Sequence, residues 1–169
     1  MPTAPATPTS YYWPIARPPF IRRGSLSNTY GPTRRNPDGS PRNHQGWDAE
    51  APVGTPILAV ADGTVYAVTD DVGDYGRTLT LALSEPTPAG AKYAFYAHLA
   101  RTDVTVGQSV RAGAVLGASG ESGNARGMAA EDQHLHFEAR TEPAPGRGLV
   151  GRLSPGVAFG WKAPLSRGT

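Results

Sequence analysis

The clearest hydrophobic pattern in the chain is an alternation of period two over short stretches. In His134–Arg140, apolar Leu135, Phe137 and Ala139 occupy every second position, and in Thr78–Leu83 leucines do the same. Such alternation places the apolar side chains on one face of a β-strand. No long stretch has the spacing of an amphipathic helix, and Gly and Pro interrupt the chain often. We therefore predict a mainly β fold, built on an antiparallel sheet with little helix.

The same alternation groups two polar side chains. His134 and His136 stand two residues apart in one predicted strand. Positions i and i+2 of a strand share a face and lie roughly 6.5–7 Å apart, so both imidazoles point away from the core together. The aromatic run Tyr93–His98 predicts a second strand, which could bring His98 to the same place from a neighbouring position.

The chain has four histidines, and the remaining one, His44, stands four residues before Asp48. Imidazole nitrogens and carboxylate oxygens are zinc ligands, and a catalytic zinc site uses three protein ligands and keeps a position for water. Four histidines and one aspartate exceed that number by two, which leaves histidines for proton transfer. A lone His-x-His pair is weak evidence, but the joint pattern favours a metal site. Spacing alone does not name the enzyme.

Three motifs together resemble one protein family. They are His44-x-x-x-Asp48, Tyr96-Ala97-His98-Leu99 and His134-Leu135-His136-Phe137-Glu138. This combination is similar to the M23 family of zinc metallopeptidases, the lysostaphin and LytM type of peptidoglycan hydrolase. Two further stretches, 54–65 and 106–120, look like the first core hairpin of that family and the turn and strand before its His-x-His motif. The similarity covers about residues 27–140, in the order of the family.

The resemblance implies a fold and a role for each site residue. The fold would be the LytM/lysostaphin-like, duplicated-hybrid-motif domain, a β-sheet with a loop-walled groove. His44, Asp48 and His136 match the zinc ligands, and His98 and His134 match the two catalytic histidines. The expected function is a zinc-dependent endopeptidase that hydrolyses peptide crosslinks of bacterial peptidoglycan. Which histidine is the base stays open, as does the choice between a D-Ala to diaminopimelate crosslink and a glycine bridge.

Two other classes of protein deserve comparison. A non-catalytic M23-like activator or wall-binding module would lack a ligand or a catalytic histidine, and this chain lacks none of the five residues. A carrier domain of the biotinyl-lipoyl type would need a modifiable lysine in a hairpin turn. The two lysines, Lys92 and Lys162, do not stand in suitable turns.

The ends of the chain differ from its middle. We expect residues 1–26 to be a Pro-rich N-terminal segment that is partly mobile, residues 27–140 to be the peptidase domain, and residues 141–169 to be a Gly/Pro-rich extension packed on it. Trp47, beside Asp48, is expected to pack under that turn, or else to line the groove. Four segments are expected to be loops that wall the groove: 30–42, 70–77, 84–91 and 121–132.

Composition restricts the chemistry and the location. Cysteine is absent, so disulfides and thiolate ligands are excluded, and the scattered basic residues, with a net charge of +2, argue against nucleic-acid binding. No stretch is long enough to span a membrane, and no secretory signal precedes Arg17. The substrate that the resemblance implies lies in the periplasm or cell wall. A trimmed leader, phage lysis or a secretion system would deliver the protein there, and an antibacterial toxin would imply a cognate immunity protein.

Overall fold

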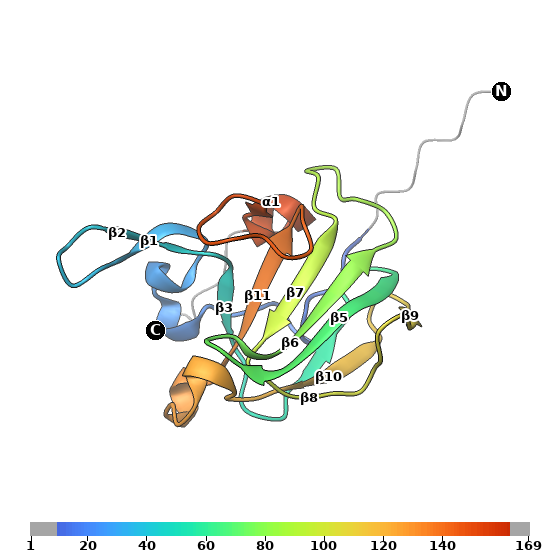
Figure 1. The fold of residues 1–169 in the computed structure, drawn as a ribbon, viewed down its shortest axis with the longest axis horizontal. Helices are drawn as coiled ribbons and strands as arrows, with labels where there is room; N and C mark the ends of the chain where they lie inside the picture. The colour runs from blue at the N-terminus through green and yellow to red at the C-terminus, as the bar shows by residue number, and fades with distance from the viewer. Residues whose placement is uncertain (1–9, 163–169) are drawn as a thin grey trace.

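The computed structural model describes residues 10–162 and centres on one curled antiparallel sheet (Figure 1). Its strands run in the order β12, β11, β7, β6, β5 and β9, and β3 pairs with β11 beyond this path. The bounds are β12 (Arg152–Leu153), β11 (His134–Arg140), β7 (Tyr93–Ala97), β6 (Gly76–Leu83), β5 (Gly63–Val72), β9 (Ser109–Val110) and β3 (Trp47–Glu50). The prediction of a mainly β fold with an antiparallel sheet is confirmed.

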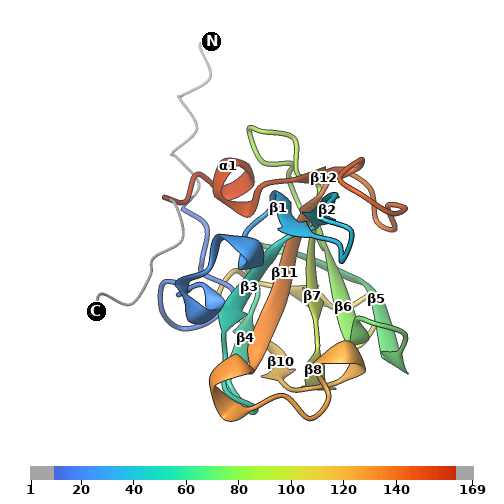
Figure 2. The ribbon, with the colours of Figure 1, turned by 90° about the vertical axis from the view of Figure 1, so that its left-hand side faces the viewer.

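Two smaller sheets complete the β structure. A three-stranded sheet runs in the order β4, β10, β8, and a hairpin of β1 and β2 projects from the body of the molecule (Figures 1 and 2). These strands are β4 (Pro56–Leu58), β10 (Val115–Ser119), β8 (Leu99–Thr102), β1 (Gly31–Arg35) and β2 (Pro41–His44). The helices are short: η1 (Arg22–Gly24), η2 (Leu26–Asn28), η3 (Gly123–Ala125), η4 (Ala130–Asp132) and α1 (Pro155–Phe159).

The hydrophobic core joins the main sheet to the three-stranded sheet. Leu81, Tyr96 and Phe137 enter it from the main sheet, and Ile57 and Leu116 enter it from the smaller one. All five side chains are buried. Since alternate residues of a strand face opposite ways, the residues between these core positions lie on the other face of the main sheet. That face therefore presents the polar residues of β11.

The segments at both ends of the described chain pack on this scaffold. Ile15 is part of the core, and the carbonyl of Pro14 accepts a hydrogen bond from the Leu58 amide at 2.9 Å. Residues 1–9, where mobility was expected, lie outside the described residues. At the other end, Trp161 contacts Trp47, which is only 3% exposed. Trp47 therefore packs inside the protein, as expected, and its ring also lines a pocket between residues 21–30 and 154–161.

Three expected groove walls are different in the structure. Residues 30–42 and 70–77 were predicted to be loops, yet most of the first range forms the β1–β2 hairpin and most of the second lies in β5 and β6. The 84–91 segment leads into the start of β7, whereas His98 follows the end of that strand, so this segment lies at the wrong end of the sheet to wall a site at His98. No helix within residues 10–162 is long and apolar enough to cross a membrane.

Candidate metal centre

The motif residues meet where β2, β3 and β11 come together. β2 ends at His44, and Asp48 of β3 is the register partner of His136 in β11. The turn between His44 and Asp48 lies directly against β11. A Cβ added at Gly46 would stand 2.1 Å from the carbonyl oxygen of Phe137, so only glycine allows this close approach. The backbone thus brings two residues four apart in sequence onto a strand far along the chain.

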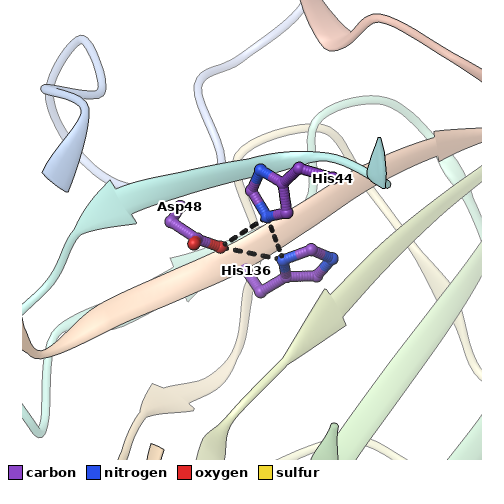
Figure 3. A group of neighbouring side chains, drawn as sticks. All are labelled: His44, Asp48 and His136. Carbon is purple, nitrogen blue, oxygen red and sulfur yellow. Dashed lines mark hydrogen bonds and ion pairs between the residues drawn. The ribbon is translucent and has the colours of Figure 1, made fainter. Parts of the chain in front are cut away.

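His44, Asp48 and His136 converge on one point (Figure 3). The Oδ1 atom of Asp48 lies 3.1 Å from Nε2 of His44 and 2.9 Å from Nδ1 of His136. The two imidazole nitrogens are 3.3 Å apart. All three side chains are buried, and their ligand atoms form a group that could hold a metal ion. The structure thus brings together all three residues that the sequence singled out as candidate ligands.

Outer hydrogen bonds turn the imidazole nitrogens toward this point. Nδ1 of His44 lies 3.0 Å from the carbonyl oxygen of Thr29, which can only accept, so Nδ1 carries the proton and Nε2 is bare. Nε2 of His136 lies 2.9 Å from Oε1 of Glu138, which leaves its Nδ1 facing Asp48. Two imidazole nitrogens and one carboxylate oxygen form a donor set that zinc prefers, whereas calcium and magnesium take oxygen ligands. The residues therefore fit zinc.

The same contacts set the protonation of the three side chains. Burial alone would lower the pKa of His136, but hydrogen bonds to Asp48 and Glu138, with their charges, raise that pKa to about 9. Burial opposes ionisation of Asp48, yet the hydrogen bond from protonated His136 and the charge of that imidazole hold the pKa of Asp48 well below the usual range. The pKa of His44 is lowered, mainly by burial. A proton on His136 thus lies where a metal would bind.

Arg34 also contacts the site, and the sequence did not predict this contact. Its Nη2 donates to Oδ2 of Asp48 at 2.6 Å, and its Nε donates to the carbonyl of Ser27 at 2.8 Å. This leaves Oδ1 of Asp48 for the two histidines. In the sequence Arg34 is one of several arginines in a basic stretch, and no local pattern distinguishes it from the others.

His98 and His134 lie beside the cluster. Their ring centroids are 5.0 Å apart, and the ring of His98 is 6.1 Å from that of His136. Nδ1 of His98 bonds the carbonyl of Ser122 at 2.9 Å, and Nδ1 of His134 bonds the carbonyl of Asp132 at 2.8 Å. Because both carbonyls can only accept, each histidine keeps a bare Nε2. The structure thus brings these two predicted residues to the same place.

The backbone of His98 is unusual. Strand alternation would place its side chain on the core face with Tyr96, but its φ of 60° breaks the alternation. Positive φ is uncommon for residues other than glycine and is found at functional sites. The His98 amide donates to the carbonyl of Tyr75 at 2.9 Å, and its carbonyl accepts from the Gly120 amide at 2.8 Å. These bonds fix the turn that directs the imidazole to the site.

Both of these histidines are neutral near pH 7. Burial, followed by the neighbouring His134 and His136, lowers the pKa of His98 to about 4. The pKa of His134 is also lowered, with burial as the largest cause. A neutral imidazole with a bare Nε2 can accept a proton, so either group has the form that a general base requires.

Comparison with known proteins places this geometry in a family. Residues 42–147, more than half of the chain, match peptidase family M23. The chain belongs to peptidase family M23. The resemblance seen in its motifs is thus confirmed.

Curated relatives include M23-type enzymes of different names. The chain is 35% identical over 148 residues to an uncharacterized metalloprotease of Haemophilus influenzae, which covers 86% of this chain and 29% of the relative. It is 35% identical to a glycyl-glycine endopeptidase of Staphylococcus capitis, over 66% of this chain and 28% of that relative. It is 32% identical to a peptidoglycan DD-endopeptidase of Vibrio cholerae, over 67% of this chain and 24% of that relative. The chain thus spans less than a third of the length of these relatives.

Solved structures agree with the fold. The catalytic domain of the antimicrobial peptidase lysostaphin from Staphylococcus simulans is 26% identical, with a TM-score of 0.57, over 75% of this chain and 85% of that one. A zinc-containing peptidase from Vibrio cholerae is 28% identical, with a TM-score of 0.56, over 69% of this chain and 33% of that one. The M23 chain therefore has the architecture of these peptidase domains.

Proposed function

We propose that this M23 chain is a zinc-dependent endopeptidase that hydrolyses peptide crosslinks of bacterial peptidoglycan, in the periplasm or cell wall. The observation that carries the proposal is the buried group of His44, Asp48 and His136 with two further neutral histidines beside it. The names of the related endopeptidases support the substrate class.

Each residue of the site has a proposed role. His44 Nε2, His136 Nδ1 and Asp48 Oδ1 would hold zinc, because these three atoms already face one another. Zinc bound there would polarise the scissile carbonyl and lower the pKa of a bound water. His98 and His134 would share the proton transfers: one accepts the proton of the attacking water at its bare Nε2, and the pair then passes that same proton to the leaving amine. The imidazole that carries the proton could also donate to the developing oxyanion before the transfer.

The orientation of the last two histidines supports these roles. Their Nδ1 atoms are bonded to backbone carbonyls, so His98 and His134 can exchange protons only through Nε2. Nε2 of His134 lies 3.8 Å from Oδ1 of Asp48, which places this nitrogen next to the proposed metal position. A proton taken from water at that position would therefore have a short path to either imidazole.

A non-catalytic activator or wall-binding module remains the second hypothesis. It is less well supported, because such a protein would have no need of a complete set of ligands together with two neutral histidines. The two functions predict different results for isolated walls: an endopeptidase releases crosslink fragments by itself, whereas an activator releases them only when a second hydrolase is added.

Digestion of two types of wall would determine which bond is cut. Purified walls with direct D-Ala to diaminopimelate crosslinks and walls with glycine bridges would be digested separately, and the soluble products identified by mass spectrometry. Related enzymes are named for glycyl-glycine and for DD-endopeptidase activity, so both substrates are tested. His44→Ala and Asp48→Ala should lose zinc and release nothing from either wall. Full zinc in either variant, measured by elemental analysis, would refute the proposed ligand set.

A further inference from the structure

A buried carboxylate lies directly behind one of the proposed ligands. The side chain of Glu138, two residues after His136 in β11, is 0% exposed. Its Oε1 atom accepts from the Tyr75 hydroxyl at 2.6 Å and lies 2.9 Å from Nε2 of His136. Its Oε2 atom accepts from Nε of Arg140 at 2.7 Å and from Nε of Arg152 at 2.8 Å. Every part of this carboxylate therefore has a defined partner.

The two arginines come from different parts of the chain. Arg140 lies on the same strand as Glu138, and its guanidinium also stacks on the ring of Phe95 at 3.5 Å. Arg152 lies in β12, beyond residue 147, where the match to the family ends. Its Nη1 donates to the carbonyls of Gly146 at 2.7 Å and Gly148 at 3.0 Å, and its side chain is only 3% exposed.

These contacts give the two oxygens of Glu138 different partners. Because Arg152 and Arg140 hold Oε2, Oε1 is left for His136 and Tyr75. A carboxylate that bonds the outer nitrogen of a ligating imidazole fixes the orientation of that ring, and loss of such a partner typically weakens metal binding about 10–100-fold. The Nε of Arg152 donates to Oε2 alone, and its Nη1 is held by two backbone carbonyls, so the bond to Glu138 has a fixed direction. Arg152 is therefore well placed to fix the ring of His136 through Glu138.

We propose that Arg152 is a positioning residue for the metal site, which acts through Glu138 to set the orientation of His136. The inference rests on the proposed role of His136 as a zinc ligand. It implies that a segment beyond the family match contributes to zinc affinity, although it supplies no ligand itself.

The test is the zinc affinity of the full chain, measured by competition with a chromophoric chelator. Arg152→Met should weaken zinc binding about 10–100-fold. Arg147→Met is the matched control, because Arg147 is an exposed arginine of the same segment, and it should leave the affinity unchanged. With cobalt(II) in place of zinc, only the Arg152 variant should show an altered visible spectrum. Equal zinc affinities and equal cobalt spectra in the two variants would overturn the inference.

A second pair of variants covers the case in which Arg152→Met fails to fold. The pair is Glu138→Gln and the double variant Glu138→Gln/Arg152→Met: the first removes the carboxylate, and the second removes Arg152 with it, so that only Arg140 lacks its partner. If Arg152 acts through Glu138, the two should bind zinc equally well. A further loss in the double variant would show that Arg152 acts by another route and would overturn the inference. His44→Ala tests the ligand set separately: zinc lost there, with normal affinity in the Arg152 variants, would refute this inference alone.

Discussion

Zinc binding should displace a proton from His136. In the metal-free protein the pKa of His136 is raised to about 9 by hydrogen bonds to Asp48 and Glu138, which outweigh the effect of burial. Nδ1 of His136, 2.9 Å from Asp48, is also the atom that would bind zinc. Since a ligating imidazole nitrogen must be free of its proton, metal and proton compete for this nitrogen. The perturbation is therefore pH, varied from 7 to 9, with the zinc affinity as the response.

The size of the effect follows from the pKa. pH 7 lies about two pH units below the pKa of His136. Removing its proton at that pH costs about 1.4 kcal/mol of free energy for each unit. Zinc should thus bind about 100-fold more weakly at pH 7 than the unprotonated site would bind it. The sign is fixed by the raised pKa: affinity rises as pH rises and levels off above pH 9. His44 adds nothing over this range, because its pKa is lowered and it is already neutral.

Titration calorimetry measures the exchange directly. Zinc is added at pH 7.5 in buffers of different ionisation enthalpy, and the dependence of the heat on the buffer gives the number of protons released. At least one proton per zinc is expected. His134→Ala is the control, since this residue is not a proposed ligand, and it should release the same number. A zinc affinity that is equal at pH 7 and pH 8.5, without proton release, would refute the assignment of a protonated His136 to the metal-free site.

Three further predictions follow from the site and its surroundings. His98→Ala and His134→Ala should keep zinc but lose about 10²–10⁴-fold in wall hydrolysis; near-normal release of fragments, with zinc content measured in parallel, would remove that residue from the catalytic pair. Metal-free protein should be most stable near pH 6.5 in thermal unfolding. Stability is lost as pH rises through the pKa of about 9 of His136, by about 3 kcal/mol, and as pH falls through the pKa of about 4 of His98; a flat profile between pH 5 and 9 would contradict these shifts. Gly46→Ala should destabilise the fold by about 1–3 kcal/mol and lower zinc occupancy, because its Cβ would meet the backbone of Phe137; unchanged chemical denaturation would show that this turn does not need glycine.

The sequence predicted β11 with its observed bounds, His134–Arg140, because alternation is strong where one face meets the core. It did not predict the turn of His98, since a positive φ at a histidine leaves no trace in a hydrophobic pattern. The β1–β2 hairpin was predicted to be a loop for a related reason. Residues 30–42 are mostly polar, with Gly and Pro, so they lack the alternation that marks a strand.

The long-range charge pairs could not be predicted either. The chain has 16 Lys and Arg residues and 14 Asp and Glu residues, and sequence alone offers no means to choose among their pairings. The fold selects Arg34 for Asp48, across 14 positions, and Arg152 for Glu138, also across 14. A motif identifies residues that are recognisable from their type and their spacing in the sequence. The pairing of Arg34 or Arg152 with its carboxylate depends instead on which segments the fold brings together.

The most direct test of the proposed endopeptidase activity is digestion of purified peptidoglycan by the zinc-loaded protein alone, followed by mass spectrometry of the peptides. We expect crosslinked peptides to disappear and fragments cut within the crosslink to appear in proportion, with no change in a parallel digest by His44→Ala. Intact crosslinks after digestion with protein that contains one zinc per chain would contradict this activity.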